Sequence, residues 1–86
     1  MHNKVQVVLY TKPGCGLCEE MKHQMQSADI ENLYTLEELN IESDPELFVR
    51  YRYEIPVLFI NGVEAFRHRL TAAAFKLYVT SLPRTD

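Results

Sequence analysis

The 86-residue sequence lacks any apolar run approaching the roughly 18 residues that a membrane-spanning helix needs. It also lacks an N-terminal apolar stretch with a small-residue cleavage site, so we expect no secretory leader. Its net charge of −3 is spread along the chain. Because there is no block of basic residues, we expect no binding to nucleic acid or to a membrane surface. These absences predict a cytoplasmic protein, which we also expect to be a monomer.

Cysteine is scarce: the chain has only Cys15 and Cys18, three residues apart. Two cysteines so close together cannot link distant parts of the chain, which excludes a disulfide-stapled secreted mini-protein. The fold must therefore depend on a hydrophobic core, for which 47% apolar residues suffice. A chain of this length encloses one such core, so residues 1–86 are predicted to form a single domain.

Apolar runs between turn residues predict strands, and apolar residues spaced three and four apart predict helices. The predicted strands are residues 4–10, 33–41 (an edge strand), 57–60 and 63–66, and the helices begin near Gly16, Pro45 and Thr71. The order is βαβαββα. A right-handed crossover makes the first two strands parallel, and a hairpin at Asn61-Gly62 adds two more. The result is an α/β fold: a four-stranded mixed sheet with helices on both faces.

Before the second helix, Ser43 and Asp44 offer a hydroxyl or a carboxylate as the N-cap. Proline follows, as is common at the first helical position. Glu46 is placed to complete a capping box with Ser43.

The segment Cys15-Gly-Leu-Cys18 lies where the first strand gives way to a helix. Unpaired N–H groups and the helix dipole make that helix end electropositive, which lowers the pKa of a thiol there. Cys15 is therefore a candidate thiolate, with Cys18 in reach of a disulfide. Two other interpretations exist: a pair of inert buried cysteines, or a zinc site. Zinc needs about four ligands, and only His2, His23 and His68 could join the cysteines, at no recognisable ligand spacing.

Three features then coincide: Cys-Gly-Leu-Cys follows a strand, Ile55-Pro56 opens the next apolar strand, and Asn61-Gly62 turns the hairpin. In this arrangement nearly the whole chain resembles the glutaredoxin and thioredoxin superfamily. Small bacterial glutaredoxin-like proteins without an agreed substrate are most similar in three segments: Tyr10-Thr-Lys-Pro-Gly-Cys15, Asp44-Pro-Glu-Leu47 and Phe66-Arg-His-Arg-Leu70. The resemblance implies a thioredoxin fold. It also implies that Pro56 is a cis-proline shaping a groove beside Cys15, where the Ile55 backbone pairs with the substrate; proline as an ordinary first strand residue is the alternative.

Glutathione-using relatives carry a Gly-Gly pair and an acidic residue after the last strand, where this chain has Phe66-Arg-His-Arg69. Lys12 matches the family lysine that contacts a glutathione carboxylate, although it could equally be an ordinary solvated lysine. The resemblance therefore implies weak use of glutathione. Arg67 and Arg69 are predicted to favour acidic surfaces of protein substrates.

The predicted function is thiol–disulfide oxidoreduction, in which Cys15 attacks a substrate disulfide and Cys18 resolves the mixed disulfide. No bound cofactor and no metal are expected, and the electrons would come from glutathione or a thioredoxin-type reductase. The expected partners are proteins with disulfides. Two alternatives stay open: a non-catalytic redox-sensing or binding module, and a glutathione-ligated iron–sulfur dimer as in some relatives.

Overall fold

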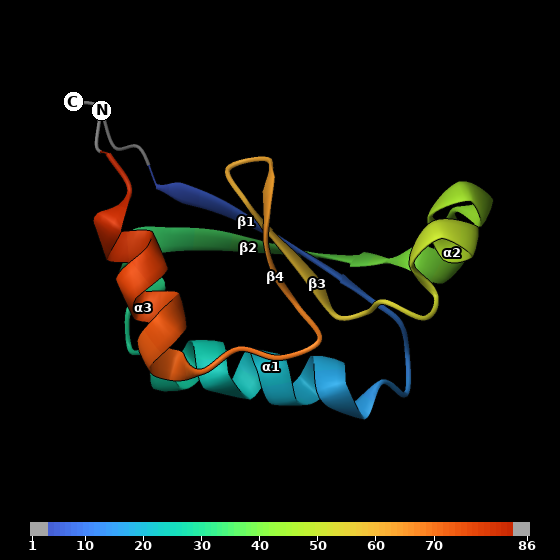
Figure 1. Cartoon of the computed structure of the whole chain (residues 1–86), viewed down its shortest axis with the longest axis horizontal. Coiled ribbons are helices and arrows are strands. Elements are labelled where there is room, and N and C mark those ends of the chain that lie inside the picture. Colours follow the sequence, from blue (N-terminus) through green and yellow to red (C-terminus); the bar gives the residue numbers. More distant parts are fainter. Residues whose placement is uncertain (1–3, 84–86) are drawn as a thin grey trace.

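The computed structural model describes residues 4–83, which form a four-stranded sheet and three α-helices (Figure 1). In chain order the elements are β1 (Val5–Thr11), α1 (Gly16–Ser27), β2 (Tyr34–Asn40), α2 (Pro45–Tyr51), β3 (Val57–Ile60), β4 (Val63–Arg67) and α3 (Ala72–Ser81). Short 3-10 turns, Glu31–Leu33 and Ile41–Ser43, flank β2. The predicted βαβαββα order is confirmed.

The sheet has the strand order β2-β1-β3-β4, so β1 is central and β2 is an edge strand, as predicted. β1 runs parallel to β2 and antiparallel to β3, and β4 is antiparallel to β3. A bulge between Leu58 and Phe59 shifts the register of the β3–β4 pair. The mixed sheet is therefore the one expected from a crossover followed by a hairpin.

Helices α1 and α3 cover the same face of the sheet and form most of its core (Figure 1). The ring of Tyr34 packs edge-on against Phe75, with centroids 5.2 Å apart. The other fully buried members come from the facing strands and helices: Val7, Leu9, Met21, Met25, Leu58, Ile60 and Val79. Each such side chain contributes about 1.5–3 kcal/mol by leaving water, so this layer is the main source of stability.

Helix α2 lies on the opposite face, which confirms helices on both faces. Its Tyr51 packs against Tyr10 and Phe59, with ring centroids 5.0 and 6.5 Å away. At seven residues α2 is about 10 Å long, whereas β1 spans about 23 Å, so one end of this face stays uncovered. There Val8 is only partly buried, beside the exposed Glu37.

The N-cap of α2 is Asp44, whose carboxylate accepts hydrogen bonds from the N–H groups of Glu46 (3.0 Å) and Leu47 (3.4 Å). The predicted capping box is wrong, because Asp44 caps the helix in place of Ser43 and Glu46 becomes its second residue. The N–H of Asp44 donates to the Ile41 carbonyl instead. Among residues 4–83, no helix is both long and apolar enough to cross a bilayer.

Candidate redox site

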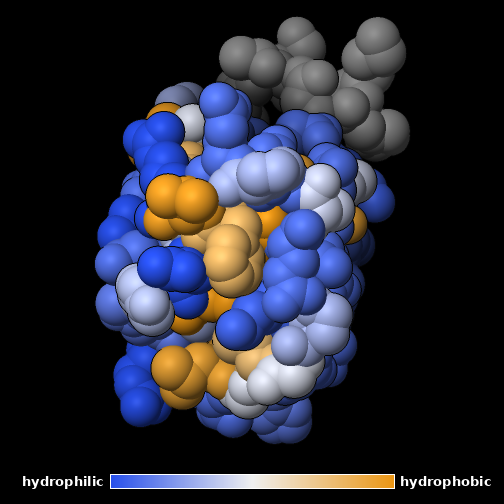
Figure 2. All heavy atoms as spheres, turned by 90° about the vertical axis from the view of Figure 1, so that its right-hand side faces the viewer, coloured by the Kyte–Doolittle hydropathy of each residue, from blue (hydrophilic) through white to orange (hydrophobic). Residues whose placement is uncertain are grey.

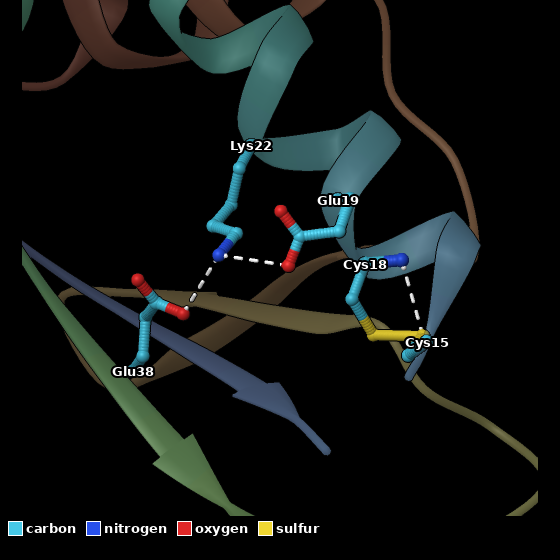
Figure 3. The surroundings of a disulfide bond; sticks show 5 residues. All are labelled: Cys15, Cys18, Glu19, Lys22 and Glu38. Carbon is cyan, nitrogen blue, oxygen red and sulfur yellow. Dashed lines mark hydrogen bonds and ion pairs between the residues drawn. A yellow bond between two sulfur atoms is a disulfide. The ribbon is translucent and has the colours of Figure 1, made fainter. Parts of the chain in front are cut away.

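The two cysteines lie at the junction of β1 and α1 and are joined by a disulfide, with their Cα atoms 5.2 Å apart (Figure 3). Cys15 is the N-cap of α1 and is partly buried, whereas Cys18 lies in the first turn and is fully buried. Only Cys15 therefore has a sulfur placed to meet another molecule.

The sulfur of Cys15 accepts a hydrogen bond from the backbone N–H of Cys18, 3.1 Å away. In this position the sulfur replaces the oxygen that usually caps a helix, and it faces the positive end of the α1 dipole. Both interactions are stronger with an anion, so on reduction they favour the thiolate of Cys15.

The turn before Cys15 depends on Gly14, whose φ of +77° lies in the left-handed region that side chains disfavour. Lys12, at the start of this turn, is partly buried. It lines a shallow pocket of about 270 Å³ together with Glu19 and Glu38. Within residues 4–83 its ammonium group makes no ion pair, which leaves its charge available beside the redox pair.

An ion-pair network beside the disulfide was not predicted from the sequence. The ammonium of Lys22 bridges the carboxylates of Glu19 (3.0 Å) and Glu38 (3.1 Å), linking α1 to β2 (Figure 3). The hydrogen bonds that Lys22 donates to Glu19 and then to Glu38 raise the pKa of Lys22 above its ordinary value. Because Lys22 compensates the charge of Glu19, this first-turn carboxylate repels a Cys15 thiolate less than the sequence suggests.

The peptide bond between Ile55 and Pro56 is cis, as the resemblance implied. Both residues are buried, and Ile55 shares an apolar cluster with Cys18 on which Cys15 packs. The N–H of Ile55 donates to the carbonyl of Tyr51 (3.1 Å). The Ile55 carbonyl accepts no hydrogen bond from the described residues, so this oxygen is the backbone group of Ile55 that could pair with a substrate.

The two candidate arginines have different surroundings. Arg67 donates two hydrogen bonds of 2.8 Å to Glu64 and one of 2.9 Å to Glu54. These bonds raise the pKa of Arg67, and the guanidinium lowers the pKa of Glu64. Arg69 is exposed and forms no ion pair within the part of the chain that the structure describes. Of the two arginines, Arg69 is therefore the one whose positive charge faces solvent without a paired carboxylate among the described residues.

His68 joins the end of β4 to the cis-proline, because its N–H donates to the Pro56 carbonyl at 2.7 Å. Its φ of +72° is rare for a residue other than glycine. The structure thus brings Ile55 and Pro56 against the cysteines. Arg69 instead lines a pocket of about 460 Å³ between α1 and the start of α3, together with Glu20.

A metal site was also considered from the sequence. Across residues 4–83 there is no group of three or more His, Cys, Asp and Glu side chains arranged to hold an ion. His2, one of the histidines considered, lies outside the described residues.

A family model described as glutaredoxin-like domain (DUF836) matches residues 6–79, nearly the whole described chain. The chain belongs to this glutaredoxin-like family. A relative, the glutaredoxin-like protein YDR286C homolog of Dictyostelium discoideum, is 31% identical over 72 residues, which cover 77% of this chain and 67% of the relative. The superfamily resemblance seen in the sequence is thereby confirmed.

Solved structures show the same fold for this glutaredoxin-like chain. Protein Ne2328 from Nitrosomonas europaea superposes with a TM-score of 0.73 and 28% identity, covering 91% of this chain and 94% of that one. Protein XcR50 from X. campestris gives 0.75 with 19% identity, covering 90% and 99%. The oxidized mitochondrial thioredoxin 3 of Saccharomyces cerevisiae gives 0.62 with 14% identity, covering 93% and 80%. The predicted thioredoxin fold is therefore confirmed, and its Cys15–Cys18 pair is consistent with a redox function.

Proposed function

We propose that this glutaredoxin-like protein is a thiol–disulfide oxidoreductase acting on protein disulfides. The observation that carries the proposal is the difference between its two sulfurs. Cys15 is only partly buried and its sulfur accepts an N–H hydrogen bond at the start of a helix, while Cys18 is fully buried. One sulfur is thus suited to attack and the other to resolution.

The cycle begins with the reduced pair. The thiolate of Cys15 attacks one sulfur of the substrate disulfide, forming a mixed disulfide and releasing the first substrate sulfur as a thiolate. Cys18 loses its proton and attacks the sulfur of Cys15, forming the Cys15–Cys18 disulfide and releasing the second substrate thiol. Two electrons pass to the substrate. Two equivalents of glutathione, or a thioredoxin-type reductase, then return the pair to its dithiol form.

A protein disulfide suits the surface better than free glutathione. Phe66 packs against Tyr78, with ring centroids 5.6 Å apart, where glutathione-using relatives leave bare glycine backbone. The N–H of Ile55 is already bonded to the Tyr51 carbonyl, which leaves one backbone group for pairing. Tight docking of a small peptide such as glutathione depends on both features.

Two surface properties support a protein partner. The end of the molecule that carries α2 shows apolar patches between hydrophilic residues (Figure 2), and Leu17, beside Cys15, is 41% exposed. Lys12 and Arg69 have uncompensated positive charge among the described residues, so they would steer acidic surfaces toward the thiol. Because Arg67 is paired with two carboxylates, we assign this steering mainly to the other two residues.

The proposal requires no bound cofactor, since the electrons reside in the cysteine pair. It places the protein in a reducing compartment such as the cytoplasm, where glutathione and reductases keep thiols reduced. Glutathione and thioredoxin-type reductases are therefore the proposed electron donors.

Coupled turnover tests the function. The oxidised protein is recycled by glutathione with its reductase, by thioredoxin with its reductase, or by thioredoxin reductase alone, and NADPH consumption is followed with a protein disulfide as substrate. We expect turnover with at least one donor, none with Cys15→Ser, and loss of multiple turnovers with Cys18→Ser. A wild-type protein that is reduced but never turns over would support the non-catalytic sensing module instead.

A further inference from the structure

The loop from Glu54 to Pro56, which presents the cis-proline to the cysteines, is fastened on two sides. We propose that Arg67 is a positioning residue that holds this loop against β4 through Glu54, so that Ile55 keeps its place in the apolar cluster on which Cys15 packs. The inference rests on the proposed oxidoreductase function. It gives Arg67 a role different from direct contact with an acidic substrate.

The clamp joins the end of β4 to Glu54 of the loop. The guanidinium of Arg67 holds Glu64 of its own strand through two parallel hydrogen bonds of 2.8 Å, which fixes its orientation. Its remaining Nη1 donates to Glu54, 2.9 Å away. The imidazole of His68 lies 3.6 Å from the same Glu54 oxygen. Glu54 thus pairs with a guanidinium group whose orientation is already fixed by Glu64.

Within the described chain, backbone hydrogen bonds do not connect the first part of this loop to β4. The N–H groups of Glu54 and Ile55 both donate to the Tyr51 carbonyl, which ties the first part of the loop to α2 alone. The carbonyl of Pro56 accepts from His68, which ties the last part to β4. Helix α2 is held to the sheet through Tyr51, which packs on Tyr10 of β1 and Phe59 of β3. The contact between Arg67 and Glu54, beside His68, adds a charged link from the first part of the loop to β4.

The register explains why the clamp acts on the groove. Arg67 pairs with Val57, the residue that follows Pro56 and shares an apolar cluster with Cys18 and Ile55. Loosening the clamp would let the loop move with α2, and the distance between Ile55 and Cys15 would no longer be held constant. Capture of a substrate backbone depends on that distance, whereas attack on a small reagent does not.

Two charge variants separate a clamp from electrostatic steering. Arg67→Lys keeps the positive charge but cannot form the two-pronged pair with Glu64. Glu54→Gln removes a negative charge, which would improve capture of an acidic substrate if steering were the role of Arg67. The clamp predicts that both variants raise KM for a protein disulfide by about two- to fivefold, with kcat within about twofold, as expected for a partly exposed ion pair. Glu46→Gln, on the exposed side of α2, is the matched control.

Two further readouts keep the inference testable. The amide of His68, which donates to the Pro56 carbonyl, should exchange with solvent faster in both variants, whereas the amide of Ile55, bonded to α2, should not. Alkylation of Cys15 by iodoacetamide should keep its wild-type rate and pH dependence. A wild-type KM in Arg67→Lys, or a lower KM in Glu54→Gln, would overturn the clamp, and so would unchanged exchange. If the wild type reduces no disulfide, the proposed function fails, and amide exchange still decides whether Arg67 holds the loop.

Discussion

The sulfur of Cys15 and the backbone N–H of Cys18 are hydrogen-bonded across 3.1 Å, so the residue that we propose as the attacking thiol of this glutaredoxin-like protein is also the N-cap of its helix. A thiolate is a stronger acceptor than a thiol or a disulfide sulfur. Reduction of the pair therefore strengthens the start of α1 while the helix stabilises the thiolate. The thiolate of Cys15 and the first turn of α1 therefore stabilise each other.

Lys22 should assist this thiolate by compensating Glu19. In Lys22→Gln the carboxylates of Glu19 and Glu38 lose their shared partner near the electropositive helix end, which favours the protonated thiol. The pH midpoint for alkylation of Cys15 should rise by about half a pH unit, from the usual size of charge effects at a helix terminus. Lys76→Gln, on the exposed face of α3, is the control. An unchanged midpoint would show that Glu19 does not influence the thiol.

Glu64 should make the protein's stability depend on acid pH. Its pKa is lowered below the ordinary value of 4.5 by the hydrogen bonds from Arg67. The folded state thus favours the ionised carboxyl, so its contribution is complete above the unfolded-state pKa and is lost as pH falls through the lowered one. Urea unfolding should show Glu64→Gln destabilised near neutral pH, with the difference from wild type shrinking on acidification. A difference independent of pH would contradict the lowered pKa.

Free glutathione should bind weakly, and Arg69→Asp should improve its binding. The substitution places an acid where glutathione-using relatives have one, able to receive the ligand's ammonium group. We expect calorimetry on reduced protein in a Cys18→Ser background to show severalfold tighter binding, of the size of one exposed charge contact. Arg69→Ala separates the gain of an acid from the loss of a cation. Wild-type affinity equal to that of a glutathione-using glutaredoxin measured in parallel would refute the expectation.

Thr71 should be the main local determinant of where α3 begins. Its hydroxyl accepts a hydrogen bond from the N–H of Ala74, 3.1 Å away. Thr71→Ala should lower the free energy of unfolding by about 1 kcal/mol, the usual value for a lost N-cap. Thr71→Ser retains the hydroxyl and should stay close to wild type. Equal losses in both variants would mean that the methyl group, and not the cap, is responsible.

Local patterns were enough to predict the fold because each element has its own signal. The apolar run of 57–60 and the turn at Asn61-Gly62 fixed the hairpin, and Pro45 and Thr71 marked two helix starts. The cap of α2 was less certain, since Ser43 and Asp44 both offer an oxygen and only the backbone geometry selects one.

The cysteine pair and the cis-proline could also be identified from sequence, whereas their charged surroundings could not. Lys22 meets Glu38 on β2, 16 residues away, and Arg67 meets Glu54, 13 residues away. Such pairs depend on the register and on the bulge in β3–β4, which short-range patterns do not encode. Arg67 was therefore predicted as a substrate contact without knowledge that two carboxylates hold it.

Trapping the mixed disulfide tests the central claim most directly. Cys18→Ser and Cys15→Ser are each reduced, mixed with a protein disulfide, quenched with acid and mapped by mass spectrometry. The account predicts a substrate adduct on Cys15 in Cys18→Ser and none on Cys18 in Cys15→Ser, because only the first sulfur is accessible and stabilised as a thiolate. An adduct on Cys18, or no adduct in either variant, would contradict it.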